Sequence, residues 1–167
     1  GSNTLRGGAG DDVIYGSQVT SSGYYDTNGY NNVGRYDGNN ILEGGAGNDT
    51  LNGGWKSDTY VFNKGDGNDT IIEQLKDGDW DGVRTVYKDV IKFGDGIVAS
   101  DLSYQHIGHD LVVTIGAGST DSITIKDWYA NADRRIEEFK FANGSVMSTT
   151  DLMNLNVAYN GLETAET

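Results

Sequence analysis

A nine-residue repeat is the feature of this sequence that most restricts its fold. Residues 7–15 and 44–52 share the pattern G-G-x-G-x-D-x-U-x, in which U is apolar. Two weaker copies, residues 53–61 and 64–72, follow in the same register, the second after Phe62 and Asn63. A unit this short cannot bury an apolar face alone, so its copies must stack on one another. The repeats therefore predict a regular stack of turns and short strands.

Two further copies carry asparagine where the others carry aspartate. Residues 35–43 have Asn40 at the sixth position, and residues 1–6 match the back half of a copy with Asn3 at that position. The sequence therefore suggests that the chain begins inside an array. A single Gly-Asp run would also be compatible with an ordinary β-turn. Several copies in one register favour the stacked repeat instead.

The pattern itself predicts a cation site. Six residues of each copy form a turn and three form a strand, and the glycines permit the positive φ angles that such a turn needs. Backbone carbonyls then point to one side, and the sixth-position aspartate adds a carboxylate. Calcium prefers six to eight hard oxygen ligands, more than one turn provides. Two turns stacked on the same edge can supply them, and because successive turns alternate edges, turn n pairs with turn n+2.

This rule sorts the sixth-position residues onto two edges. The first edge carries Asp12, Asp49 and Asp69. The second edge carries Asn3, Asn40 and Asp58. The first edge offers two gaps with a carboxylate on each side, whereas the gap between Asn40 and Asp58 has one carboxylate fewer. We therefore expect tighter binding on the first edge and about two to four calcium ions in all.

The candidate metal ligands are the turn residues and their aspartates. They are Gly7, Ala9, Asp11, Asp12, Gly38, Asn40, Gly44, Gly45, Ala46, Gly47, Asp49, Gly53, Asp58, Gly65, Gly67 and Asp69. The apolar eighth-position residues should point inward as a thin core: Leu5, Ile14, Leu42, Leu51, Tyr60 and Ile71.

Residues 1–72 resemble the RTX (repeats-in-toxin) calcium-binding block of proteins exported by type I secretion. The flank at 126–135 is similar to the segment after the last block of adenylate cyclase toxin-haemolysins. The resemblance implies an all-β fold, a parallel β-roll followed by a small antiparallel cap with a short C-terminal helix. It also implies secretion in an unfolded state and calcium-driven folding outside the cell or at the bacterial surface.

The rest of the chain alternates like an antiparallel sheet. Leu111, Val113 and Ile115 face one way, and Asn143-Gly144 is a strong hairpin signal. We expect a β-roll over 1–73, an acidic connecting loop over 74–88, a β-rich cap over 89–157 with a helix near Asp151, and a loose tail over 158–167. Trp128 and Tyr129 should lie in the core where roll and cap meet.

Two segments interrupt this pattern. Residues 16–37 are rich in Tyr, Asn and Gly, and Tyr24, Tyr25 and Tyr30 are candidate ligand contacts if this stretch is more than a solvated loop. Asp77, Asp79 and Asp81 match the first half of an EF-hand loop, although Lys88 stands where its final Glu would be. That segment is either an irregular calcium site, closed by Asp89 or a neighbour, or a merely acidic loop.

Composition and motifs exclude several functions. The formal net charge of −13 argues against nucleic acid and anionic membranes as partners. The sequence has no cysteine, no H-E-x-x-H, no G-x-S-x-G and no phosphate-binding loop, and His106 and His109 lack a third zinc ligand of suitable spacing. We therefore predict a monomeric binding module, neither an enzyme nor a membrane-inserting protein, whose partners are calcium and, through a larger parent, the type I secretion machinery.

The expected function is calcium-dependent folding of a secreted module. With a dissociation constant of roughly 10⁻⁴–10⁻³ M and calcium at tenfold excess, three sites would add about 4 kcal/mol. That is a large part of a typical folding free energy of about 5–15 kcal/mol. The alternative is an adhesin-like recognition module that binds a glycan or peptide through the Tyr-rich loop or the face of the roll.

Overall fold

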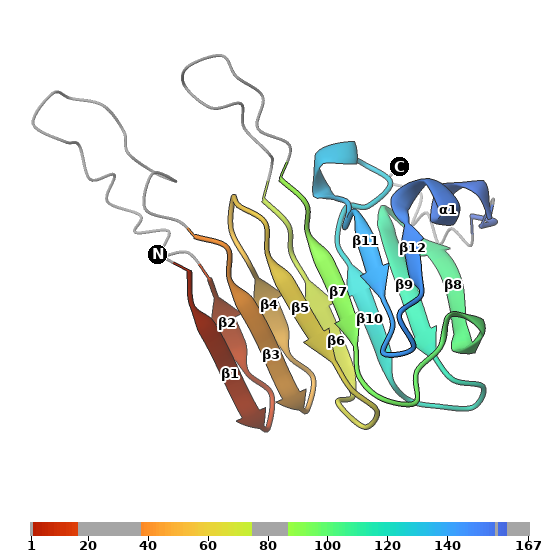
Figure 1. Cartoon of the computed structure of the whole chain (residues 1–167). Coiled ribbons are helices and arrows are strands. Elements are labelled where there is room, and N and C mark those ends of the chain that lie inside the picture. Colours follow the sequence, from red (N-terminus) through yellow and green to blue (C-terminus); the bar gives the residue numbers. More distant parts are fainter. Residues whose placement is uncertain (1, 17–37, 75–86, 156, 160–167) are drawn as a thin grey trace, which may run out of the picture.

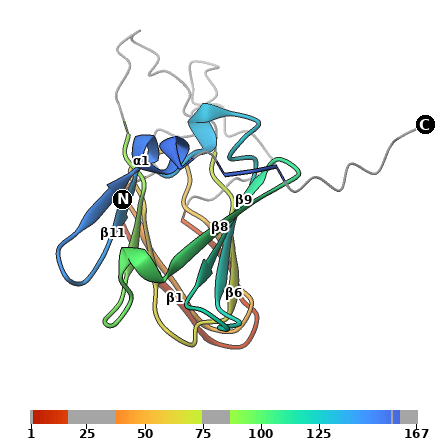
Figure 2. The ribbon, with the colours of Figure 1, turned by 90° about the vertical axis from the view of Figure 1, so that its right-hand side faces the viewer.

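A computed structural model describes residues 2–16, 38–74, 87–155 and 157–159 of the 167-residue chain. Its strands form two six-stranded sheets that face each other as the two walls of a flattened roll (Figures 1 and 2). From the first strand to the eighth, successive strands alternate between the two sheets, so the turns lie along two edges of the roll. The fold is all-β; the described residues include one short α-helix and two single-turn 3₁₀ helices, Ala99–Asp101 and Ala132–Arg134.

The strands of the two sheets follow in spatial order. The first sheet consists of β1 (Thr4–Ala9), β3 (Ile41–Ala46), β5 (Thr59–Phe62), β7 (Val90–Phe93), β11 (Glu138–Lys140) and β12 (Val146–Ser148). The second consists of β2 (Val13–Tyr15), β4 (Thr50–Asn52), β6 (Asn68–Ile71), β10 (Ser122–Ile125), β9 (Asp110–Ile115) and β8 (Leu102–Ile107).

The predicted pairing of turn n with turn n+2 is confirmed by the strand register. In the first sheet Leu42 lies beside Leu5 and Tyr60, in parallel strands. In the second sheet Leu51 lies beside Ile14 and Ile71, again in parallel. Equivalent residues of successive repeats thus line up along the stack. The sixth-position side chains of each edge therefore form a row.

The parallel stack extends beyond the repeats. Strand β7 pairs in parallel with β5, and β10 pairs in parallel with β6, although sequence analysis assigned both to an antiparallel cap. Antiparallel pairing is confined to β8–β9–β10 and β11–β12 at the C-terminal end. The segment after residue 88 therefore begins as further turns of the roll, because Val90–Phe93 and Ser122–Ile125 repeat the alternation of the nonapeptide strands.

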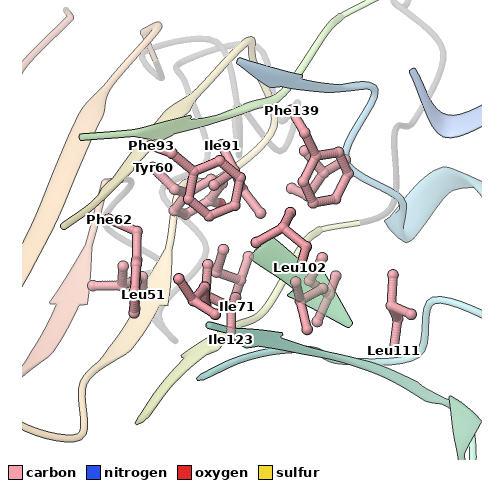
Figure 3. Packing of buried hydrophobic residues seen from close by; sticks show 14 of the residues in the cluster. Leu51, Tyr60, Phe62, Ile71, Ile91, Phe93, Leu102, Leu111, Ile123 and Phe139 are labelled. Atoms are coloured by element: carbon pink, nitrogen blue, oxygen red, sulfur yellow. The ribbon is translucent and has the colours of Figure 1, made fainter. Parts of the chain in front are cut away.

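One apolar core runs between the sheets and into the C-terminal region (Figure 3). The eighth-position residues Ile14, Leu42, Leu51, Tyr60 and Ile71 are all buried, as predicted, and Leu5 packs against them while partly exposed. The core thickens toward the C-terminus, where Phe93 stacks on Phe139 and Phe141. Trp128 is buried beside Phe139, as expected of a junction residue, and Tyr129 is partly buried.

The helix and hairpin expected near the C-terminus are present. Residues Asn143-Gly144 join β11 to β12. Helix α1 (Thr149–Asn154) begins just before Asp151, which accepts a hydrogen bond from the N–H of its N-cap residue, Ser148, in a capping box. Leu152 anchors the helix to the core.

Candidate metal centre

The aspartates of the first edge are linked in a ladder. The backbone N–H of Asp12 donates to Oδ1 of Asp49 at 2.8 Å, and the N–H of Asp49 donates to Oδ1 of Asp69 at 3.1 Å. Asp49 and Asp69 are buried, with exposed fractions of 1% and 2%. One oxygen of each of these two carboxylates therefore holds the preceding turn in place.

The other carboxylate oxygen has no such partner. Oδ2 of Asp12, Asp49 and Asp69 is buried and accepts no hydrogen bond from any described residue. A buried, uncompensated anionic oxygen is costly, and a row of them repels itself. Burial and the neighbouring Asp49, Asp66 and Asp121 carboxylates raise the pKa of Asp69 to about 7, although a hydrogen bond from the Asp49 backbone opposes the shift. This row of oxygens requires a cation or a proton.

The first glycine of each repeat provides the space for that oxygen. A Cβ at Gly7 would lie 2.4 Å from Oδ2 of Asp12, and one at Gly44 would lie 2.2 Å from Oδ2 of Asp49. Both distances are far below van der Waals contact. Any larger residue at these positions would push the carboxylate out of its place.

The second and fourth glycines serve the stacking of the turns. Gly45 has a φ of +97°, which favours glycine, and a Cβ there would lie 2.0 Å from the carbonyl oxygen of Gly8 in the adjacent turn. A Cβ at Gly47 would lie 2.3 Å from the carbonyl oxygen of Gly10. Adjacent turns can therefore approach closely only where these glycines stand.

Backbone carbonyls converge on the same place as the carboxylates. The carbonyl oxygen of Gly44 lies 2.6 Å from the Cβ position of Gly7, which is also 2.4 Å from Oδ2 of Asp12. The carboxylate of one turn and the carbonyl of the next turn thus face a common gap. No group of three or more acidic, histidine or cysteine side chains that could hold a metal occurs within the described ranges. Backbone carbonyls must therefore complete any coordination sphere, and hard oxygens of this kind suit calcium.

The second edge carries a longer ladder than the sequence predicted. The N–H of Asn40 donates to Oδ1 of Asp58 at 2.7 Å, and the N–H of Asp58 donates to Oδ1 of Asp89 at 2.8 Å. The N–H of Asp89 in turn donates to Oε2 of Glu137 at 2.7 Å. Asp58 and Asp89 are fully buried. Asp89 is therefore the sixth-position residue of a further turn.

Asp89 is hard to recognise from the sequence as a sixth-position residue, because no nonapeptide precedes it. Because Leu51 pairs with Ile71, Glu73 is level with Gly53 and is the first residue of the next turn. Its sixth-position residue, Asp89, comes only after residues 74–88 in the sequence. The signal that could have found it is the tripeptide Asp89-Val90-Ile91, which is identical to Asp12-Val13-Ile14. Both tripeptides end a turn and start an inward-facing strand.

Other predicted site residues have different surroundings. Oδ1 of Asp11 is exposed and accepts the N–H of Asn48, so Asp11 joins neighbouring turns outside the row of buried oxygens. The carbonyl of Ala46 accepts the N–H of Gly10. Gly65 and Gly67 belong to the irregular turn before Asp69, where the N–H of Gly65 donates to Oδ2 of Asp121.

Several predicted residues lie outside the described ranges. These are Tyr24, Tyr25 and Tyr30 of the Tyr-rich loop and Asp77, Asp79 and Asp81 of the acidic loop. Ala9 and Gly38 lie within the described ranges. Ala9 is level with Ala46 of the adjacent turn, and the carbonyl of Gly38 accepts a hydrogen bond from Nδ2 of Asn40.

Two family models match this chain. The model described as "RTX calcium-binding nonapeptide repeat (4 copies)" matches residues 1–18 and 36–71. The model described as "Haemolysin-type calcium binding protein related domain" matches residues 110–151. Both are families of structural modules without enzymatic activity, and proteins with RTX repeats are typically secreted.

A curated protein shows a partial likeness. "Iron-regulated protein FrpA" of Neisseria meningitidis serogroup C is 32% identical over 100 residues, which is 58% of this chain and 8% of that protein. The chain therefore spans less than a tenth of that relative. Among the described residues, no helix has the length and apolar character needed to cross a membrane.

Proposed function

The chain carries an RTX calcium-binding repeat block, and from this premise we propose that it is a module of a larger secreted protein that folds when calcium enters the gaps between its stacked turns. The observation that carries the proposal is the row of buried Oδ2 atoms of Asp12, Asp49 and Asp69, which no described hydrogen-bond donor reaches. A divalent ion in each gap would neutralise the carboxylates and join two turns at once.

Three gaps have aspartate on both sides. They lie between Asp12 and Asp49, between Asp49 and Asp69, and between Asp58 and Asp89. On the second edge the carbonyl of Glu73, the first residue of the Asp89 turn, already accepts a hydrogen bond from Arg134 at 3.2 Å. A carbonyl that already accepts a hydrogen bond from a guanidinium is a weaker ligand for a cation, so we expect the first-edge gaps to bind calcium more tightly.

The carboxylates explain why folding would depend on calcium. Without ions, the buried anions of successive turns repel one another, and the thin repeat core must offset the conformational entropy of a glycine-rich chain alone. This is compatible with export of the unfolded chain by a type I system and with folding at extracellular calcium concentrations. The parent protein's activity then depends on parts outside these residues.

Circular dichroism with calcium stoichiometry tests the proposal. We expect a spectrum of disordered chain in excess chelator and a β-rich spectrum in millimolar calcium, with about three ions bound per chain. A β-rich spectrum that does not change in chelator, or a folded chain without bound calcium, would overturn it.

A further inference from the structure

One turn of the second edge has an amide where the others have a carboxylate. Gly16 is held level with Gly53 by its N–H, which donates to the carbonyl of Asn52 at 2.7 Å. A Cβ at Gly16 would lie 2.7 Å from Nδ2 of Asn40 and 2.4 Å from the carbonyl oxygen of Gly53. Gly16 and Asn40 therefore have the same relation as the first glycine and the aspartate of another turn, and they belong to one turn.

The side chain of Asn40 bridges the oxygens that line this gap. Its Nδ2 donates to the carbonyl of Gly38 at 2.9 Å and to the carbonyl of Gly53 at 3.2 Å. Its Oδ1 accepts the N–H of Asn3 at 3.1 Å, the ladder hydrogen bond that an aspartate Oδ1 accepts elsewhere. One face of the amide thus continues the ladder, and the other satisfies two backbone carbonyls.

The equivalent gap of the first edge has the opposite electrostatic character. There, Oδ2 of Asp12 and the carbonyl oxygen of Gly44 face the same point beside Gly7, so two oxygens converge with no donor between them. A cation resolves that arrangement. In the Asn40 turn the partly positive NH₂ group already lies between the oxygens, and an amide nitrogen has no lone pair to offer a metal ion.

The hydrogen bonds also fix the orientation of this amide. Rotating it by half a turn would bring Nδ2 against the N–H of Asn3, which places donor against donor. It would also turn Oδ1 toward the carbonyls of Gly38 and Gly53, which places oxygen against oxygen. Calcium binding through Oδ1 would therefore require both of these unfavourable contacts.

We propose that the Asn40 amide is a built-in substitute for calcium, so that the turn closed by Gly16 and Asn40 forms without an ion. The inference rests on the proposed function, because it assigns calcium to the gaps with aspartate on both sides and excludes it from this one. The turn that contains Gly16 and Asn40 would then remain closed by hydrogen bonds alone. Asn40 would be the residue that decides which gap of the second edge takes an ion.

Replacing the amide by a carboxylate tests the inference. Calcium bound at saturation is measured by equilibrium dialysis for the whole chain and for Asn40→Asp. The variant should bind one ion more than the wild type. Asn39→Asp is the matched control, because it adds the same charge at the adjacent residue. Oδ1 of Asn39 accepts a hydrogen bond from the N–H of Ser57 at 3.2 Å, and a carboxylate can keep this bond. Asn39→Asp should bind the wild-type number.

A second variant, Asn40→Ala, keeps the inference testable if Asn40→Asp does not fold. Asn40→Ala removes the amide, and it should bind as many ions as the wild type while its midpoint of thermal unfolding falls. Loss of one ion in Asn40→Ala would show that Asn40 is a calcium ligand and would overturn the inference. An unchanged stoichiometry in folded Asn40→Asp would overturn it too. A wild-type chain that binds no calcium would instead overturn the proposed function.

Discussion

The backbone N–H of Asp49 donates to Oδ1 of Asp69, 20 positions further along the chain, at 3.1 Å. The N–H of Asp12 donates in the same way to Asp49, which is 37 positions away. The same hydrogen bond forms across two different sequence separations. The stacking of turns, not the local sequence, therefore brings the carboxylates together. Asp49 therefore borders two gaps, and its substitution tests two of the proposed calcium sites at once.

Calcium should fold the chain where magnesium does not. Magnesium demands a small octahedron and gives up its water reluctantly, whereas the gaps offer carbonyls and carboxylates in a geometry set by the strand spacing. We expect millimolar calcium to produce β structure by circular dichroism and equal magnesium to leave the chain largely disordered. Equal effects of the two ions would indicate simple charge screening.

Asp49→Ala should weaken calcium-dependent folding more than Asp58→Ala. Asp49 borders two gaps with aspartate on both sides, whereas Asp58 borders one, because the Asn40 amide fills its other gap. At tenfold excess over the dissociation constant each ion contributes about 1.4 kcal/mol, so the losses should be about 2.8 and about 1.4 kcal/mol. Urea unfolding at fixed calcium measures both; equal losses would argue against sharing.

Gly44→Ala should lower calcium affinity although alanine is small. The new Cβ would lie 2.2 Å from Oδ2 of Asp49 and would displace that oxygen from the gap. Gly118→Ala is the control, because Gly118 has a φ of +74° but open space around its Cβ position. It should cost about 1 kcal/mol of stability through backbone strain and leave the calcium midpoint almost unchanged. Similar calcium midpoints for the two variants would contradict the role assigned to Gly44.

Calcium binding should weaken below neutral pH. In the absence of cations, burial raises the pKa of Asp69 to about 7, so between about pH 4 and pH 7 the folded form holds a proton that the unfolded form has lost. The metal-free fold therefore loses stability as the pH rises through this range. Calcium competes with that proton, and at pH 6 we expect the affinity of the Asp49–Asp69 gap to be about tenfold below its value at pH 8.

Asp69→Asn provides the control for this pH effect. Its amide does not titrate, so the calcium titration of the remaining sites should depend less on pH than that of the wild type. Isothermal titration calorimetry at the two pH values measures both proteins. A wild-type affinity that is the same at pH 6 and pH 8 would show that Asp69 is not among the ligands.

Removal of residues 84–167 should raise the calcium concentration needed to fold the roll by at least about tenfold. The deletion takes away β7 and β10, which pair with the last repeat strands, β5 and β6, and it removes the aromatic end of the core. A linear stack loses stability at an uncovered end. If residues 1–83 fold at the same calcium concentration as the whole chain, the C-terminal region has a role other than capping.

Much of this architecture could be predicted from residue spacing. The nonapeptide period alone determined the alternation of edges, the inward residues such as Leu42 and Leu51, and which sixth-position residues lie on each edge. The reason is physical: a nine-residue unit with glycines at set positions has one way to turn and one way to stack. The hairpin at Asn143-Gly144 and the helix near Asp151 follow from equally local signals.

Other features depend on pairings that no local pattern encodes. Asp89 and Glu137 join the second-edge ladder because β7 and β11 continue the first sheet, and their turns are interrupted by long segments. From the sequence alone Asn40 is a candidate calcium ligand, because an asparagine at the aspartate position is an oxygen ligand with less charge. Only the tertiary structure shows its nitrogen between the carbonyls of Gly38 and Gly53. The sequence determined which residues form the rows, but the stacking of distant turns decided what each side chain faces.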